Sequence, residues 1–308
     1  MRSVTIDGLA VRINGVSVFQ RLLLDQGYYA DGVMTAPSDQ ALIDDIQLSL
    51  DAGFNGARLH QKVFEERFLY HADRVGYLVW GEFGDWGVDR ANPRAGYITE
   101  WLEILERDYS HPSIVGWCPL NETPQARPEG IEGLDDLTRG LFLATKAMDQ
   151  SRPVLDTSGY SHRVPETDIY DSHDYTQEPD EFAKKHASTR DGIPHFNGPE
   201  DRRWSIPYAG QPYFVSEFGG IRWNPSEANS SDSWGYGREP SDIEEFYARF
   251  DSMCKTLLED PSMFAYCYTQ LTDVFQEQNG VYFFDRSEKF DMARIRASQQ
   301  RAAAIEEG

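Results

Sequence analysis

Short apolar runs alternate with longer amphipathic segments along this chain of 308 residues. The runs are nearly continuous in Leu, Val, Ile, Phe and Trp, which is typical of parallel strands buried on both faces. They lie at residues 21–26, 56–60, 77–83, 113–120, 153–158, 169–175, 213–218 and 264–271. Eight such strands, alternating with helical segments, predict an α/β fold, a (β/α)8 TIM barrel.

The amphipathic segments predict helices at residues 38–51, 64–75, 98–109, 134–150, 241–259 and 291–306. Ser38 and Ser241 are suitable N-caps, and Gly53 and Gly76 follow two of the segments as stop signals. Only about ten residues separate the fifth and sixth strands, so we expect a loop there instead of a crossover helix. The long intervals 176–212 and 219–240 follow strands, which predicts extended loops at the C-terminal face of the barrel.

A β-hairpin is predicted before the first barrel strand. Residues 4–13 alternate between apolar and polar side chains, and Asn14-Gly15 is a strong signal for a type I′ turn. We expect residues 1–20 to form this hairpin and to cap the bottom of the barrel. Residues 1–308 are then expected to form a single barrel domain.

The charge balance narrows the possible partners. The chain carries 29 Lys and Arg against 51 Asp and Glu, a net charge of −22, so neither nucleic acid nor an anionic membrane is an expected partner. The N-terminus lacks the pattern of a signal peptide, and no apolar run is long enough to span a membrane, so we expect a cytoplasmic protein. The widely spaced Cys118, Cys254 and Cys267 indicate buried free thiols and not disulfides or metal ligands.

Two glutamates stand where strands end. The run SIVGWCPLNET at residues 113–123 ends an apolar strand in Asn121-Glu122, and PYFVSEFGG at 212–220 places Glu217 at the end of another, with glycines behind it. The carboxyl ends of barrel strands meet at one rim, where catalytic groups belong. Two carboxylates at that rim suit cleavage of a glycosidic bond, with retention of configuration if they lie about 5 Å apart. Alternatively, either glutamate could be a rim residue paired with a cation.

These motifs resemble the catalytic barrel of glycoside hydrolase family 2, the family of β-galactosidases, β-glucuronidases and β-mannosidases. The resemblance covers nearly the whole chain, from RINGVSVFQRLLLDQGYY at 12–29, through HPSIVGWCPLNE, DSHDY and VSEFGG, to YCYTQLTDVFQEQNGVYFFDR at 266–286. It implies a carbohydrate-metabolising hydrolase that cleaves terminal β-glycosides by double displacement and needs no cofactor. In the family, the residues matching Glu122 and Glu217 are the acid/base and the nucleophile.

The resemblance also implies roles for other rim residues. Arg58 is expected beside Glu217, where a cation favours the ionised carboxylate, while Glu122 is expected against a less polar wall. Asn121 resembles the residue that binds the 2-hydroxyl of the sugar, and we expect Tyr175 to donate to the nucleophile. Further candidates for substrate contact at strand ends are His60, His173, Asp25 and Gln270. Each histidine could equally have a structural role.

Aromatic residues near the rim could stack on sugar rings. They are Trp80, Trp86, Trp223, Trp234 and Tyr236. We expect Trp223 and Trp234, in the long interval after the seventh strand, to contact the aglycone. Packing in a loop or in the core is the alternative for each of them.

Three departures from the family pattern limit what the resemblance implies. The eighth strand reads Tyr-Cys-Tyr-Thr-Gln where many members have a tryptophan. Residues 279–281 lack the lysine of the Asn-x-Lys motif with which the glucuronidases bind a uronate, so we favour a β-galactosidase-like activity. The β-sandwich domains that normally precede the barrel are absent from this chain, so we expect weak substrate affinity, and exposed apolar surface could drive homo-oligomerisation.

Two other classes of function remain open. A non-catalytic or weakly active sugar-binding barrel would share the fold, because the fold alone does not determine activity. The glutamate pair favours the enzyme, since a binding module has no use for two facing carboxylates. A metal-dependent lyase would need an acidic triad on adjacent strand ends, and we identify no such metal site in the sequence.

Overall fold

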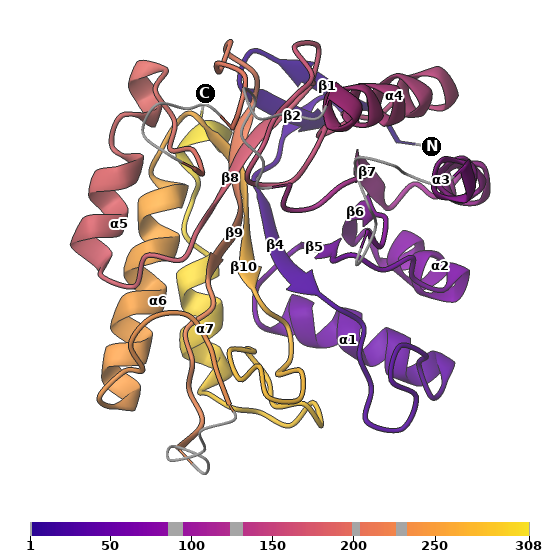
Figure 1. Ribbon diagram of the computed structural model, residues 1–308. Coiled ribbons are helices and arrows are strands. Elements are labelled where there is room, and N and C mark those ends of the chain that lie inside the picture. The colour runs from indigo at the N-terminus through magenta and orange to yellow at the C-terminus, as the bar shows by residue number, and fades with distance from the viewer. Residues whose placement is uncertain (1, 86–94, 124–131, 199–203, 226–232, 308) are drawn as a thin grey trace.

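The computed structural model describes residues 2–85, 95–123, 132–198, 204–225 and 233–307. Its centre is a curled parallel sheet (Figure 1), with the strand order β7-β6-β5-β4-β10-β9-β8. The strands are β4 (Gln20–Asp25), β5 (Gly56–Leu59), β6 (Leu78–Glu82), β7 (Ile114–Cys118), β8 (Tyr170–Asp174), β9 (Tyr213–Gly219) and β10 (Met263–Thr269). These are the first four and the last three of the expected strands, and they confirm the (β/α)8 barrel.

The expected fifth strand, residues 153–158, joins the barrel without a regular ladder. Its main chain pairs with β7, through Leu155 N donating to Trp117 O at 2.9 Å and Glu122 N donating to Ser158 O at 2.9 Å. Toward β8, the Asp171 carboxylate accepts instead from the Gly159 N–H and the Ser158 hydroxyl. Side chains therefore replace part of the strand-to-strand hydrogen bonding at the place where the barrel closes.

Helices lie outside the sheet and cover it (Figure 1). They are α1 (Asp39–Asp51), α2 (Glu66–Val75), α3 (Ala95–Asp108), α4 (Glu132–Met148), α5 (Pro179–His186), α6 (Ile243–Leu258) and α7 (Met292–Gln299). Ser38 caps α1 as expected, and Gly76 ends α2 in the left-handed conformation. The connection from residue 159 to β8 contains no helix, which confirms the loop expected there. Among the described helices, none combines the length and the apolar character needed to cross a membrane.

Three local expectations were wrong. The interval 176–212 contains α5, which begins with Pro179 and acidic residues and ends with basic ones, all favourable for a helix. Asp242, not Ser241, caps α6, because its carboxylate accepts the N–H of Glu245. The last helix ends at Gln299, and a separate 3-10 turn, Ala304–Glu306, lets the Glu306 carboxylate accept the Phe19 N–H at the start of β4.

Large apolar side chains fill the barrel interior. Trp80 is fully buried there and stacks on Phe214, with ring centroids 5.4 Å apart. Trp80 is therefore a core residue and not the sugar-stacking residue that its place near the rim suggested. Cys118 and Cys267 belong to the same cluster, and all three cysteines are buried free thiols, as expected.

The N-terminal segment forms three short antiparallel strands where a single hairpin was expected. They are β1 (Val4–Asp7), β2 (Ala10–Ile13) and β3 (Val16–Ser17). The expected turn at Asn14-Gly15 is present, with φ values of 53° and 81°, as a type I′ turn requires. A second turn at Gly8 divides the long first strand. Val11 packs against the side chains inside the barrel, so the segment covers the end opposite the carboxyl ends of the strands (Figure 1).

Candidate active site

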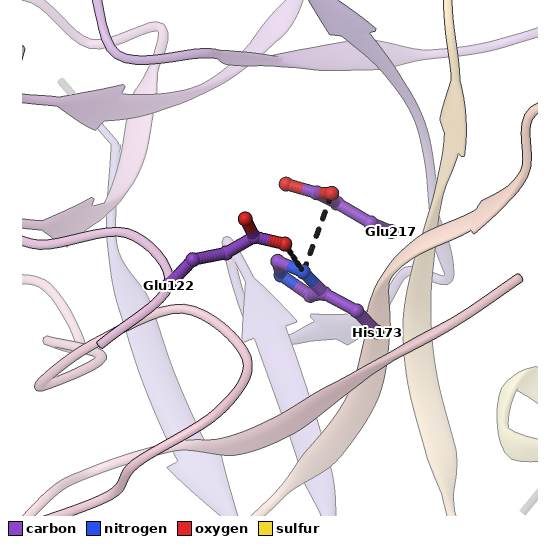
Figure 2. A group of neighbouring side chains, drawn as sticks. All are labelled: Glu122, His173 and Glu217. Carbon is purple, nitrogen blue, oxygen red and sulfur yellow. Dashed lines mark hydrogen bonds and ion pairs between the residues drawn. The ribbon is translucent and has the colours of Figure 1, made fainter. Parts of the chain in front are cut away.

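The two glutamates singled out in the sequence meet at the carboxyl ends of the barrel strands. Glu217 lies within β9, and Glu122 follows β7 by four residues. His173, on the intervening β8, lies between them (Figure 2). Its Nδ1 is 2.9 Å from Glu122 Oε1 and 3.3 Å from Glu217 Oε2. One histidine nitrogen therefore contacts both carboxylates.

Arg58, at the end of β5, is the cation of this cluster and is fully buried. It donates to Glu217 Oε1 at 2.9 Å, to Asn121 Oδ1 at 2.7 Å and to the Ser216 carbonyl at 2.7 Å. It also forms an ion pair with Glu82 at the end of β6. Four acceptors on three other strand ends thus hold the guanidinium, and Arg58 in turn orients both Asn121 and Glu217.

The pKa values of the two histidines of the cluster are shifted in opposite directions. Burial, assisted by the nearby charge of Arg58, lowers the pKa of His60 to about 3. Arg58 donates to its Nδ1 at 3.2 Å, which leaves the ring proton of the neutral form on Nε2. Burial also opposes protonation of His173, but the carboxylates of Glu217 and Glu122 outweigh it and raise its pKa.

Tyr175 completes the surroundings of Glu217. Its hydroxyl donates to Glu217 Oε2 at 2.5 Å and lies 3.1 Å from Thr269 Oγ1 at the end of β10. Burial and the negative charge of Glu217 raise the pKa of Tyr175, so the phenol keeps its proton and remains a donor. Glu217 thereby receives hydrogen bonds on both oxygens, one from Tyr175 and one from Arg58.

Glu122 differs from Glu217 in its surroundings. Its side chain is 40% exposed, against 4% for Glu217, and its Oε1 lies 2.9 Å from His173 Nδ1. The less polar wall expected around Glu122 stays a prediction. Its backbone is also unusual, because Glu122 adopts a φ of 46° in the left-handed region that favours glycine.

The other predicted residues have different surroundings. Gln270 follows β10 and accepts from the Gln26 amide at 2.8 Å. Trp234 is 42% exposed and packs edge-on against Tyr236. Trp223 packs against the core between the sheet and its helices. Trp86 lies outside the described residues.

Asp25 is buried at the end of β4, where it accepts the N–H of Gly27. Burial, with the nearby charge of Asp45, raises its pKa from 3.8 to about 7. A raised pKa in the folded state stabilises the fold below pH 4, and this contribution is lost as the pH rises toward 7. At about 1.4 kcal/mol for each pH unit between the two pKa values, the loss is at most about 4 kcal/mol.

Asp25→Asn is therefore expected to remove this pH dependence, because the amide keeps an acceptor for Gly27 and cannot ionise. Urea unfolding at intervals from pH 4 to pH 8 measures the effect, and the variant should become the more stable protein at pH 8. Asp31→Asn, which removes an exposed carboxyl from the next loop, serves as the control. Parallel stability curves for Asp25→Asn and the wild type would contradict the assignment.

Glu82 belongs to the site and was not assigned to it from the sequence, whereas Tyr236, a candidate there for sugar stacking, contacts the site residue Tyr175. Glu82 ends the apolar run YLVWGEF, so its place at a strand end was the available signal. Tyr236 stacks face to face on Tyr175, with centroids 3.4 Å apart and planes inclined by 3°. Gly220 permits this stack, since a Cβ there would come within 2.4 Å of the Tyr236 ring. The paired glycines after Glu217 were the signal for such a close approach.

Glu122, His173 and Glu217 also form a group that could hold a metal ion, because their ligand atoms lie within 4.8 Å of one another. Glu217 is already held by a guanidinium and a phenol, as expected of a carboxylate positioned for reaction with a substrate. We therefore describe the group as two carboxylates with a histidine between them, and assign no metal to it.

Comparisons with known proteins identify what this chain is similar to. No family model matches the chain. A β-glucuronidase of Bacteroides fragilis is 26% identical over 175 residues, which cover 50% of this chain and 24% of that protein. A β-glucuronidase of Chlorocebus aethiops is 30% identical over 120 residues, 37% of this chain and 18% of that protein. A β-galactosidase of Leuconostoc mesenteroides is 29% identical over 152 residues, 46% of this chain and 13% of that protein.

Solved structures extend the similarity to the whole fold. A GH2 β-galacturonidase from Eisenbergiella tayi superposes with a TM-score of 0.75 at 17% identity, over 97% of this chain and 54% of that one. A β-glucuronidase of Bifidobacterium dentium gives a TM-score of 0.78 at 18% identity, over 97% of this chain and 49% of that one. The chain thus spans about half of each structure, and its matches span a quarter or less of the curated relatives. The resemblance to the catalytic barrel of glycoside hydrolase family 2 is confirmed, and the proteins similar to this chain are glycosidases.

Proposed function

We propose that this chain is the catalytic barrel of a retaining β-glycosidase, in which Glu217 is the nucleophile and Glu122 the general acid/base. The proposal concerns the barrel alone, because the chain covers 49% and 54% of the two structural neighbours described above. The names of its relatives have the hydrolysis of β-glycosides in common. The double displacement is part of our proposal.

The spacing of the two carboxylates carries the proposal. An oxygen of Glu122 and an oxygen of Glu217 lie within 4.8 Å of each other. Retaining glycosidases hold their carboxyl groups about 5–5.5 Å apart, whereas inverting enzymes need about 6.5–9.5 Å to fit a water molecule beside the sugar. The short spacing favours direct attack by one carboxylate on the anomeric carbon.

The surroundings of the two glutamates suit different roles. Glu217, held by Arg58 and Tyr175, attacks the anomeric carbon as the glycosidic C–O bond breaks, and Glu122 gives its proton to the leaving oxygen. Water then attacks the glycosyl ester, Glu122 takes the proton of that water, and the bond to Glu217 breaks. The exposed position of Glu122 agrees with this role, since it must reach first the aglycone and then water.

His173 helps to account for the proton that Glu122 needs. Its Nε2 lies 2.9 Å from Ser158 Oγ, and that hydroxyl donates to the Asp171 carboxylate at 3.2 Å. Ser158 must then accept from Nε2–H, which leaves Nδ1 of the neutral ring as an acceptor. A protonated Glu122 donates to that acceptor, so Glu122 and His173 can share one proton in the resting site.

The stereochemical course of hydrolysis tests this proposal. The chain is incubated with a panel of aryl β-glycosides, and the anomer released first is followed by NMR. Double displacement predicts that the β-anomer appears before mutarotation. Initial release of the α-anomer would exclude the proposed mechanism, and the absence of hydrolysis of every glycoside would exclude the activity.

Tyr175→Phe is expected to lower kcat/KM by about 10- to 100-fold, because Glu217 loses a hydrogen bond to a charged acceptor. The stacked Tyr236 should preserve the position of the ring, so the fold should change little. Steady-state kinetics with an aryl glycoside measures the effect. Tyr109→Phe, at a 51% exposed position on the outer surface, is the control, and equal rates for both variants would refute the role of Tyr175.

A further inference from the structure

Glu277 is a third carboxylate, within electrostatic reach of Glu217. It lies in the connection after β10 and is partly exposed. Gln26 donates to its Oε2 at 3.1 Å, and Asn279 donates to its Oε1 at 3.2 Å. Gln270 links these two amides, accepting from Gln26 at 2.8 Å and donating to Asn279 at 2.8 Å. The ring of three amides holds the Glu277 carboxylate in one orientation.

This ring adjoins the groups that hold the nucleophile. Gln270 directly follows Thr269, whose hydroxyl lies 3.1 Å from the Tyr175 hydroxyl, and Tyr175 donates to Glu217. The main chain of Glu277 also pairs with Trp234, which packs against Tyr236. Burial raises the pKa of Glu277, and the charge of Glu217 raises it further, so the two carboxylates are within electrostatic reach.

The described cations around this end of the barrel are already paired with acids. Arg58 contacts Glu82 and Glu217 and donates to two further acceptors. On the neighbouring connections the pairs are Lys62 with Glu65, Arg222 with Glu239, Arg286 with Asp45, and Lys289 with Asp273. A sugar carboxylate bound beside Glu277 would add a further negative charge near Glu277 and Glu217, and the Lys and Arg residues named above are already paired. Like charges at such distances repel, and more strongly where water is excluded.

We propose that Glu277 determines the sugar class of the substrate, by accepting a hydrogen bond from a hydroxyl of an uncharged glycone and by repelling uronates. The proposal rests on the proposed function and makes it more specific. The relatives named β-glucuronidase and β-galacturonidase act, by their names, on uronides. This chain would instead cleave β-glycosides of neutral sugars, as the name of the Leuconostoc mesenteroides β-galactosidase indicates for that relative.

Matched substrates test the proposal by turnover. Aryl β-D-galactoside and β-D-galacturonide differ only at C6, as do the β-D-glucoside and the β-D-glucuronide. We expect kcat/KM of the 308-residue chain to be at least tenfold higher for the neutral member of a pair. Glu277→Gln should reduce the ratio of kcat/KM for the neutral substrate to kcat/KM for the uronide at least threefold. It should also lower kcat/KM for the neutral substrate, since an amide is a weaker acceptor than a carboxylate. Glu288→Gln removes the same charge from an exposed site on the same connection and should change neither rate.

Binding of two ring-nitrogen analogues separates recognition from chemistry. Isofagomine and uronic isofagomine share the cationic nitrogen and differ in the carboxylate, and calorimetry gives their dissociation constants. Tighter binding of isofagomine by at least tenfold, with the gap reduced in Glu277→Gln, supports the proposal even if no glycoside is hydrolysed. Tighter binding of the uronic form, no binding of either analogue, or a gap unchanged by Glu277→Gln would overturn it. Hydrolysis that prefers uronides would overturn this inference and leave the glycosidase function standing.

Discussion

Glu217→Gly is expected to lower kcat for an aryl β-glycoside by on the order of 10⁵- to 10⁶-fold, the size of loss seen when a covalent nucleophile is removed. Without this carboxylate no glycosyl ester can form, and Arg58 and Tyr175 have no reacting group to orient. The space left by the side chain can admit a small anion. Azide should therefore restore cleavage and give the α-glycosyl azide, whose inverted configuration is read by NMR.

The corresponding change at Glu122 distinguishes the two roles. Glu122→Gly should slow substrates with poor leaving groups most, because they depend on protonation of the departing oxygen. Azide should then attack the glycosyl ester on Glu217 and give the β-glycosyl azide, with retained configuration. A β-azide from the Glu217 variant and an α-azide from the Glu122 variant would exchange the two assignments.

Arg58→Met is expected to lower the free energy of unfolding by about 3–5 kcal/mol, because it leaves the buried Glu82 and Glu217 without their cation. Burial already raises the pKa of Glu82, with Arg58 opposing the rise. Removing Arg58 should raise this pKa further. Since a raised pKa in the folded state makes stability fall as the pH rises, the deficit of the variant should be larger at pH 8 than at pH 5.

Urea unfolding at both pH values measures this effect. Arg67→Met is the matched control, since Arg67 pairs with Asp39 at the surface, where the two side chains are 56% and 52% exposed. An exposed pair contributes about 1 kcal/mol or less, so this control should unfold almost as the wild type does. Equal losses for the two variants would show that the buried pairs contribute no more than a surface pair.

The strands and the two glutamates could be predicted because both depend on local patterns. Apolar runs predict buried strands, and a charged residue after such a run must lie at the rim. Arg58 and Tyr175 could be placed for the same reason, since each stands at a strand end. Even so, the same reasoning misplaced Trp80, because the pattern does not say whether a residue near a strand end points inward to the core or out to the rim.

The remaining features depend on contacts between distant segments. Residues 153–158 read as an ordinary strand, but Asp171 supplies side-chain hydrogen bonds in place of a ladder on one side. Glu277 lies in a connection without a strong pattern, and its orientation depends on Gln26, an amide far away in the sequence that donates to its Oε2. The helix α5 is a different case, because its signals are local: a proline and acidic residues in its first turn and basic residues in its last.

The left-handed backbone of Glu122 bears on any attempt to improve this protein. That conformation costs a residue with a side chain on the order of 1 kcal/mol, whereas glycine adopts it almost without cost. Variants chosen only for resistance to heat or proteolysis would therefore favour glycine at position 122. Such a screen would select more stable variants that lack the proposed proton donor. Libraries of this chain therefore need selection for turnover at every round.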